Sequence, residues 1–525
     1  MKKIASLLLA VIVCTSLVLS SCSPKNDEQQ TNSSDNAAVS DEKVKLSFIA
    51  ALNPATEDLN NSEFLKSAAD EANVEISYEC IFSDWSTKKA ALLAAGDLPD
   101  AFVGAWVFTP QEVGANRDLF LPLQDLIKNN APDIQKVIDA DKNYKTVITE
   151  LDSTIFYLTA KSAFRPMTYT SLQMNQEWLK NLNLKVPTTL EEFEAVLKAF
   201  KEKDANGNGD PNDEIPMYMS LTGDEAWSTM CFMGSFDCAT SITSKFVVKN
   251  DKVVYQPITE NYKKYVTWLA KLKTEGLMPE EVATAKWAQV SATLGNDVPI
   301  VGVTNAWLKD PINVAYQDQY AAIAPLTGPD GARFIAGSES AAVYEIAPSF
   351  VLSKTCKNPE AVIKFINSFY TPEKAIQINF GPVGKTLELV NDKYNMVDPP
   401  EGMDWDTWLY KNSVNGGWPC YISKEAESLF AAIPHADSAK MGIDEINRPF
   451  VKLEENIPVL KFNEDEIAEL AIIETDINKY VDKMVAEWFV NGNVEGTWDK
   501  YIAELDKMGM PRYIEIYQTA YDAQK

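Results

Sequence analysis

A regular alternation of apolar and polar residues predicts that the globular part of the chain begins with a β-strand at residues 44–50. Helical spacing follows over residues 62–73, and a second alternating stretch over 74–78 predicts the next strand. A helix over 87–95, ended by a glycine, and a short apolar strand over 101–103 complete the series. This order predicts a parallel sheet with helices on both faces, which binds ligands at the carboxyl ends of its strands.

Helical periodicity returns in the middle and at the end of the chain. Thr188-Thr189-Leu190-Glu191 has the spacing of a capping box, and the apolar residues after it predict an amphipathic helix over 190–203. Residues 464–491 and 497–521 show the same period, so the end of the protein is expected to be helical.

The first 22 residues have the pattern of a targeting segment. Met1-Lys2-Lys3 is positively charged, and residues 4–19 form a mostly apolar run of the length of a secretory signal. Leu19-Ser20-Ser21-Cys22 resembles the lipobox of bacterial lipoproteins, which implies that Cys22 is lipidated. The alternative is an ordinary signal peptide (1–22) followed by a chance cysteine.

Residues 23–42 are almost wholly polar and contain no aromatic residue. Such a segment cannot bury enough apolar surface to offset the entropy of ordering, so we expect a flexible tether. The rest of the chain contains no second apolar stretch of membrane-spanning length, so the sequence predicts a membrane-anchored protein that does not cross the membrane.

Composition and charge narrow the possible functions. The chain has 525 residues, 46% hydrophobic and 23% charged, which is typical of a globular protein long enough for several domains. Its 75 acidic residues exceed its 48 lysines and arginines, so the formal charge is -27. This field repels phosphate backbones and argues against a nucleic-acid partner.

Histidine and cysteine are too few for several kinds of site. The single histidine, His435, excludes any site that needs two imidazoles, and its loop-like setting favours a packing role over catalysis. Five cysteines follow Cys22, an odd number, so at least one thiol is free. Whether Cys231 and Cys238 form a disulfide stays open.

Several stretches together resemble extracellular solute-binding protein family 1, in particular the large lipoproteins that serve saccharide ABC importers. They are Gly96-Asp97-Leu98-Pro99-Asp100, the segment 175–193 with its Asn175-Gln176-Glu177-Trp178, and the C-terminal segments 498–509 and 517–522. The resemblance runs nearly end to end. It implies an α/β, two-lobed periplasmic-binding-protein-like fold (type II), in which each lobe is a mostly parallel sheet flanked by helices, with extra C-terminal helices.

By the same resemblance, the first lobe takes residues 43–158 and 345–400, and the second takes 159–344 and 401–525. The implied function is that of a lipid-anchored, extracytoplasmic solute-binding protein without catalytic activity. It would capture an oligosaccharide, deliver it to the permease subunits of an ABC importer, and act as a monomer.

A loop rich in oxygen side chains predicts a structural calcium site. Its D-x-N-x-N-G opening places carboxylate and amide oxygens at alternate positions, with glycines for the sharp turn. The loop is not an EF-hand helix-loop-helix, because Ile215 takes the closing acidic position and no helix pattern follows. The resembled family carries a similar loop; the alternative is an Asn-Gly turn without metal. The expected ligands are Asp204, Asn206, Asn208, Asp210, Asp213 and Glu214.

Tryptophan side chains are the candidate platforms for a sugar ring, although most aromatic residues of a globular protein are core. Trp106 and Trp307 occupy places that look like the stacking positions of maltodextrin-type binders. Trp227, Trp287 and Trp418 are further candidates.

Two other functions are consistent with parts of the sequence. An extracellular glycoside hydrolase would use two of the many carboxylates, but no acid pair stands out. A surface receptor or adhesin would share the tether and would bind a protein partner instead of a saccharide.

Overall fold

The computed structural model describes residues 42–104, 107–162, 166–168, 171–220, 229–241, 244–306, 309, 311–337, 347–403, 405–414, 416–432 and 435–525.

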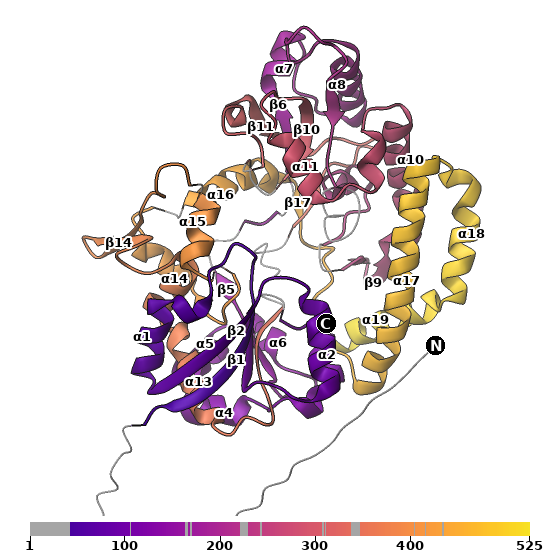
Figure 1. Cartoon of the computed structure of the whole chain (residues 1–525). Helices are drawn as coiled ribbons and strands as arrows, with labels where there is room; N and C mark the ends of the chain where they lie inside the picture. Colours follow the sequence, from indigo (N-terminus) through magenta and orange to yellow (C-terminus); the bar gives the residue numbers. More distant parts are fainter. Residues whose placement is uncertain are drawn as a thin grey trace, which may run out of the picture. The chain divides into compact units, whose positions relative to one another are not determined.

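The first sheet joins a parallel N-terminal unit to a strand from far along the chain. The sheet has the order β2-β1-β3-β13-β4, with β1 (Val44–Ala51), β2 (Val74–Ile81), β3 (Ala101–Gly104), β4 (Tyr157–Thr159) and β13 (Pro348–Leu352) (Figure 1).

The pairing within this sheet is mixed. β1 is parallel to β2 and to β3, as the strand–helix pattern predicts, whereas β13 is antiparallel to β3 and β4. Asp100 fixes the start of β3 on β1, because its Oδ2 accepts hydrogen bonds from Ser47 N at 2.8 Å and Ser47 Oγ at 3.0 Å. This is the structural role of the aspartate that closes the Gly-Asp-Leu-Pro-Asp segment.

The helices of the first lobe come from both parts of the chain. α2 ends at Gly96, whose φ of +70° is the left-handed conformation expected of a C-cap. α1 packs on β2, and α4, α5 and α13 contact one another. The helices are α1 (Glu63–Glu71), α2 (Trp85–Ala95), α3 (Pro110–Ala115), α4 (Gln124–Asn130), α5 (Pro132–Ala140), α6 (Lys142–Ile148), α13 (Pro359–Asn367), α14 (Pro372–Phe380) and α15 (Trp405–Asn412).

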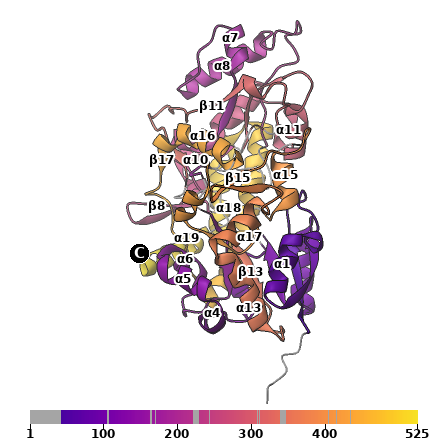
Figure 2. The same cartoon turned by 90° about the vertical axis from the view of Figure 1, so that its left-hand side faces the viewer.

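The second sheet has the order β11-β6-β10-β7. β10 is parallel to β7 and antiparallel to β6, and β11 is antiparallel to β6, so this sheet is mixed instead of mostly parallel. The strands are β6 (Leu172–Asn175), β7 (Ile215–Met217), β10 (Val301–Asn305) and β11 (Tyr320–Ile323). Two views place α7 (Gln176–Asn181) and α8 (Leu190–Glu202) beside this sheet (Figures 1 and 2).

The start of α8 confirms the predicted helix and shifts its cap by one residue. Thr189 Oγ1 accepts a hydrogen bond from Glu192 N at 3.1 Å, and Glu192 Oε2 accepts from Thr188 N at 2.8 Å. Glu192, not Glu191, therefore closes the cap. Further elements of this lobe are β8 (Phe246–Lys249), β9 (Lys252–Tyr255), α9 (Met230–Met233), α10 (Glu260–Thr274) and α11 (Trp287–Leu294).

The C-terminal part is helical, as expected, but its second predicted helix is two helices. α17 (Glu464–Asn491) is followed by α18 (Val494–Lys507) and α19 (Met510–Gln524). The break lies at Gly509, whose φ of +99° is incompatible with a continuous α-helix. α17 packs along α10 and also contacts α3 of the first lobe, where Arg117 forms an ion pair with Glu464 at 3.0 Å.

Two hydrophobic cores underlie the compact unit formed by residues 43–525. The first core includes Leu409, Trp418 and Phe430, so it reaches further along the chain than the expected return segment 345–400. The second core contains the residues of the second sheet together with those of α17, α18 and α19.

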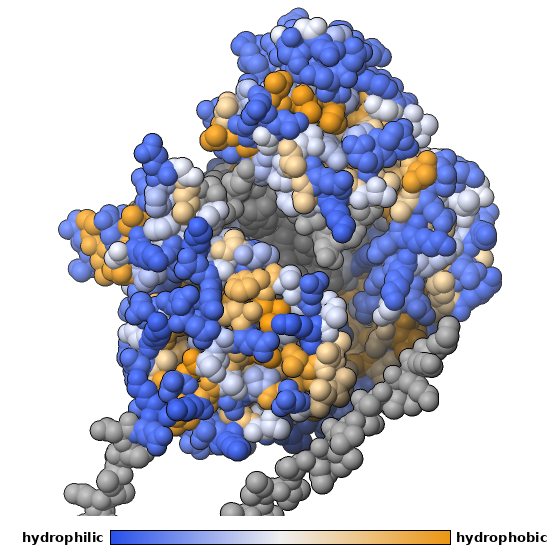
Figure 3. All heavy atoms as spheres, in the orientation of Figure 1, coloured by the Kyte–Doolittle hydropathy of each residue, from blue (hydrophilic) through white to orange (hydrophobic). Residues whose placement is uncertain are grey.

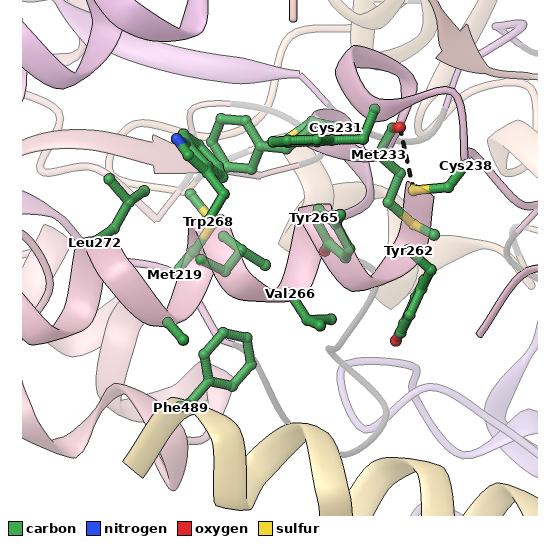
Figure 4. Packing of buried hydrophobic residues seen from close by; sticks show 14 of the residues in the cluster. Met219, Cys231, Met233, Cys238, Tyr262, Tyr265, Val266, Trp268, Leu272 and Phe489 are labelled. Atoms are coloured by element: carbon green, nitrogen blue, oxygen red, sulfur yellow. Dashed lines mark hydrogen bonds between the residues drawn. The ribbon is translucent and has the colours of Figure 1, made fainter. Parts of the chain in front are cut away.

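The second core also holds two of the cysteines (Figure 4). Cys231 and Cys238 are buried and are not joined by a disulfide in this structure. The Cys238 thiol donates to the carbonyl oxygen of Met233 at 3.4 Å. Both thiols have a raised pKa because burial disfavours the thiolate, which suits small apolar core residues.

The chain crosses from one core to the other along several segments. They run from β4 to β6, from β12 (Ile335–Ala336) to β13, and from Phe430 to Phe462. These segments pack closely: a Cβ atom on Gly337 would lie 2.6 Å from the Met167 carbonyl oxygen and 2.8 Å from Val451 Cγ1. β12 pairs with β17 (Val451–Lys452), and β5 (Lys161–Ser162) pairs with β16 (Tyr421–Ile422). We call Met167, Gly337 and Val451 the crossover contact.

The surface agrees with the acidic composition. Hydrophilic residues dominate the face in Figure 3, and the apolar residues on it lie in small groups. One hairpin, β14 (Leu387–Val390) and β15 (Lys393–Met396), exposes Leu389 and Val390 near its turn.

Candidate functional site

The predicted calcium loop lies between α8 and β7 of the second lobe. Gly207 and Gly209 have φ values of +75° and +94°, so the glycines make the turn that the sequence pattern requires. Asn181 Nδ2 donates to the carbonyl oxygen of Ala205 at 3.0 Å, which fixes the loop to α7.

Two carboxylates at the ends of the loop each leave one oxygen without a partner. Asp204 Oδ2 accepts from Gly209 N at 2.9 Å, and Glu214 Oε1 accepts from Ala205 N at 2.8 Å. Asp204 Oδ1 and Glu214 Oε2 are buried and have no hydrogen-bond partner. Burial raises the pKa of Glu214. A buried carboxylate of this kind is stabilised by a cation.

The middle of the loop fits a cation less well in this conformation. Asn206 Nδ2 and Asn208 Nδ2 donate to the two oxygens of Asp213 at 3.1 and 2.6 Å, and Asp210 Oδ1 accepts from Asn212 N at 3.1 Å. Within the described ranges, no three acidic, histidine or cysteine side chains gather as a metal site. A calcium shell would therefore need the amide and backbone oxygens of the loop, with Asp204 and Glu214 as its acidic members.

Three of the five candidate tryptophans, Trp106, Trp227 and Trp307, lie outside the described residues. Trp287 begins α11 and is half-buried against the second core. Trp418 is 0% exposed and its ring packs edge-on against Phe369 at 5.2 Å, in the first core. Because no face of this ring is exposed, the expectation that Trp418 stacks on a sugar does not fit this structure.

The strand that precedes Trp106 ends in a tightly constrained glycine. Gly104 has φ +128°, and a Cβ atom there would lie 2.0 Å from the carbonyl oxygen of Ala51. Only glycine allows β3 to approach β1 this closely at its carboxyl end. The predicted ligand edge of the first sheet is thus fixed by backbone packing.

A second group of residues, which the sequence pattern did not reveal, lies near the crossover contact. Asp444 of α16 (His435–Asn447) accepts hydrogen bonds at Oδ1 from both Thr168 N and Thr168 Oγ1, each at 2.9 Å. Asn447 Nδ2 donates to Thr168 Oγ1 at 3.3 Å. Lys440, Asp444, Asn447 and Thr168 are all buried; we call these four residues the polar cluster.

The polar cluster lies where elements of both lobes meet. α16 contacts α15, which belongs to the first lobe, and β11 of the second sheet. Thr168 follows Met167 of the crossover contact and precedes β6. One residue before β6, Ser171 N donates to Asn305 Oδ1 at the carboxyl end of β10, at 2.9 Å. These positions adjoin the strand ends at which α/β sheets bind ligands.

Burial affects Lys440 strongly. Desolvation lowers its pKa to about 7, and the negative charge of Asp444 opposes the shift. His435 begins α16, but its side chain is not among those described. The sequence contains one signal of this cluster, the i, i+4, i+7 spacing of Lys440, Asp444 and Asn447. This spacing places the three residues on one face of a helix but does not indicate whether that face is buried.

The chain has two α/β lobes, and it crosses repeatedly from one to the other, with polar groups buried at the crossings. This arrangement is that of the two-lobed binding proteins. The model of the bacterial extracellular solute-binding protein family matches residues 56–376, more than half of the chain, so the chain belongs to this family. It is a solute-binding protein and not an enzyme, as the sequence predicts.

Relatives of known description cover almost the whole chain. The fructooligosaccharide ABC transporter substrate-binding protein FusA of Streptococcus pneumoniae is 28% identical over 98% of this chain and 97% of its own length. The polygalacturonan/rhamnogalacturonan-binding protein YtcQ of Bacillus subtilis is 22% identical over 99% of both chains. A solved structure of a FusA EF-hand mutant from S. pneumoniae, in complex with fructo-nystose, matches with a TM-score of 0.82. It is 27% identical and covers 91% of this chain and 99% of that one.

Among the described residues, no helix is long and apolar enough to cross a membrane.

Proposed function

We propose that this protein is the receptor of an ABC importer, which captures an oligosaccharide outside the membrane and delivers it to the permease subunits. The end-to-end similarity to FusA carries this proposal, because it extends over both lobes and the C-terminal helices.

A thermal-shift panel tests this function. We expect a neutral or acidic oligosaccharide to raise the unfolding midpoint, since ligand at about 100 times its dissociation constant stabilises by about 2.7 kcal/mol. The same samples should release no new reducing ends. Reducing ends that accumulate with time would indicate a glycosidase, and a panel without any shift would remove the saccharide assignment.

The aromatic side chains of the proposed binding site are Trp106, Trp227, Trp287 and Trp307. Their support is the sequence position of Trp106 and Trp307, directly after β3 and close after β10, where the sheets present their carboxyl ends. Stacking on these rings would cover the apolar face of a sugar while polar groups bind its hydroxyls.

We propose that calcium occupies the loop 204–214 and has a structural role. The two buried carboxylate oxygens without partners, on Asp204 and Glu214, support it. The known EF-hand of FusA, named in its mutant structure, supports a cation site in a similar protein. Calcium would be bound by these two residues and by oxygens of Asn206, Asn208, Asp210 and Asp213, and it would hold the loop closed.

We propose lipid anchoring at Cys22, a flexible tether over 23–42, and a monomeric receptor at the outer face of the cell membrane. The lipobox-like Leu19-Ser20-Ser21-Cys22 supports the anchor. Replacement Cys22→Ala is expected to move the protein from the membrane fraction to the medium or periplasm. Retention of this variant in the membrane fraction would contradict the anchor.

A further inference from the structure

Lys461 is buried at the point where the crossing from Phe430 to Phe462 enters the second core. It is 7% exposed, and the next residue, Phe462, packs against Tyr517 of α19 with ring centroids 5.0 Å apart. Two residues further on, α17 begins at Glu464. The backbone at Lys461 is therefore attached to the second lobe.

The side chain of Lys461, in contrast, is held by the first lobe. Its Nζ donates to the carbonyl oxygen of Val147 at 2.6 Å, to Tyr157 Oη at 2.7 Å and to Glu150 Oε1 at 3.4 Å. Tyr157 Oη in turn donates to the same carbonyl oxygen at 2.8 Å. An ammonium group has three donors, so these three acceptors satisfy it although it is buried.

The backbone of Lys461 is also held by the last helix. Gln524 Oε1 accepts from Lys461 N at 3.0 Å, and Gln524 Nε2 donates to the carbonyl oxygen of Lys461 at 2.8 Å. Gln524 is the last residue of α19, whose apolar residues are in the second core. One residue thus carries hydrogen bonds to both lobes, three through its side chain and two through its backbone.

Two other anchors of the crossing segments bind them to one lobe each. In the first lobe, Asp141 Oδ2 accepts from Lys161 Nζ and from Tyr421 Oη, both at 2.8 Å. Asn456 Nδ2 donates to the carbonyl oxygen of Gly337 at 2.7 Å, which ties two crossings together beside β8 of the second lobe. These anchors hold the ends of the crossings, whereas Lys461 is a point common to both lobes.

We propose that Lys461 and Gln524 form a pivot, at which the two lobes can rotate relative to one another but cannot slide or separate. A point held by hydrogen bonds from both sides cannot be displaced without breaking them, whereas rotation about it leaves their lengths nearly unchanged. Hinges of domain movements are a few residues in loops or at the ends of elements. Lys461 precedes α17 and Gln524 ends α19. The inference goes beyond the proposed function, because it concerns how the lobes are joined and not what they bind.

Distances between two spin labels, measured by pulsed electron resonance, test the pivot without any saccharide. The labels are attached through Lys66→Cys on α1 of the first lobe and Lys180→Cys on α7 of the second, at two exposed positions (Figure 1). Residues 43–525 form one compact unit, so the chain from Ser23 onward is used. Cys80→Ser removes the half-buried thiol, which would otherwise take a label.

Two variants cut the pivot from opposite sides. K461M removes the three hydrogen bonds to the first lobe, and Q524A removes the two that join Lys461 to α19. We expect each to broaden the distribution of label distances at least twofold, because the lobes are then joined at this point from one side only. Gln524 is exposed at the end of the chain, so Q524A compared with its control decides the matter if K461M does not fold.

Each variant has a matched control that keeps the pivot. K89M removes another buried lysine, 8% exposed, whose Nζ donates to Glu112 Oε2 at 2.6 Å within the first lobe. Q518A removes a second glutamine of α19, which accepts from Val253 N at 2.8 Å and donates to the carbonyl oxygen of Asp251 at 3.2 Å within the second lobe. Both controls should lower the unfolding midpoint and leave the distance distribution as narrow as in the native chain.

Unchanged distributions in K461M and Q524A would overturn the pivot. Broadening in only one of two folded variants would show that the joint is not held from both sides, and it would overturn the pivot as well. Equal broadening in K89M or Q518A would do the same, since any lost hydrogen bond would then loosen the lobes. Because no saccharide is present, none of these results bears on the proposed receptor function.

Discussion

The most unusual single residue of the described chain is Lys440, because it is buried beside the carboxylate of Asp444 and its pKa lies far below the ordinary value of a lysine. In the unfolded chain this lysine keeps its proton up to about pH 10.5, whereas in the folded protein its pKa is about 7. Between these values the unfolded state binds more protons, so the contribution of Lys440 to the free energy of unfolding rises with pH.

Replacement Lys440→Met should remove this pH dependence. We expect the free energy of unfolding of the native protein, minus that of K440M, to increase by up to about 1.4 kcal/mol per pH unit between pH 7 and 10. Denaturant unfolding at pH 7, 8 and 9 measures this difference. Lys66→Met, at an exposed lysine of α1, is the control and should show a constant difference. A constant difference for K440M would show that Lys440 titrates normally.

At the scale of elements, the loop 204–214 is where metal removal should act. Excess chelator is expected to lower the unfolding midpoint by a few degrees. The reason is that a ligand present at about 100 times its dissociation constant stabilises the folded state by about 2.7 kcal/mol, and the chelator removes this stabilisation. Glu214→Gln, which weakens a buried ligand, should lower the midpoint with calcium and abolish the chelator effect. Asp330→Asn, on an exposed ion pair with Lys264, is the control and should respond to chelator like the native protein. Identical melting curves with and without chelator, and no calcium by elemental analysis, would contradict the site.

The elements that the sequence predicts correctly are those that local pattern determines. The strands at the start of the first lobe, α2 with its glycine cap and α8 follow from alternation, helical period and capping within a few residues. The family resemblance placed residues 345–400 in the first lobe, but the pairing of β13 with β3 does not follow from local pattern, because the two strands are distant in sequence. The split of the last helix depended on the left-handed conformation of Gly509, which the helical period did not reveal.

The candidate site was predicted only in part, for the same reason. The proposed calcium loop is a continuous stretch, so its spacing is visible in the sequence. The polar cluster unites Thr168 with α16, and its existence depends on which face of that helix is buried. Trp418 shows the converse: the sequence made it a candidate platform for a sugar ring, yet its ring is in the first core.

At the scale of the whole molecule, the two cores, the repeated crossings and the helices α17 to α19 belong to one compact unit. α17 contacts α10 of the second lobe and α3 of the first, so the C-terminal helices are part of the receptor and not an appendage. This agrees with a similarity to FusA that extends over the full length. The formal charge of -27 disfavours polyanionic ligands.

The most direct test of the saccharide receptor is a calorimetric titration of the mature chain with a panel of neutral and acidic oligosaccharides that includes nystose, followed by analysis of the sugar after the titration. We expect saturable binding of one oligosaccharide per chain, with the sugar recovered intact. No heat of binding with nystose or with any other oligosaccharide of the panel, or recovery of cleaved sugar, would contradict the account.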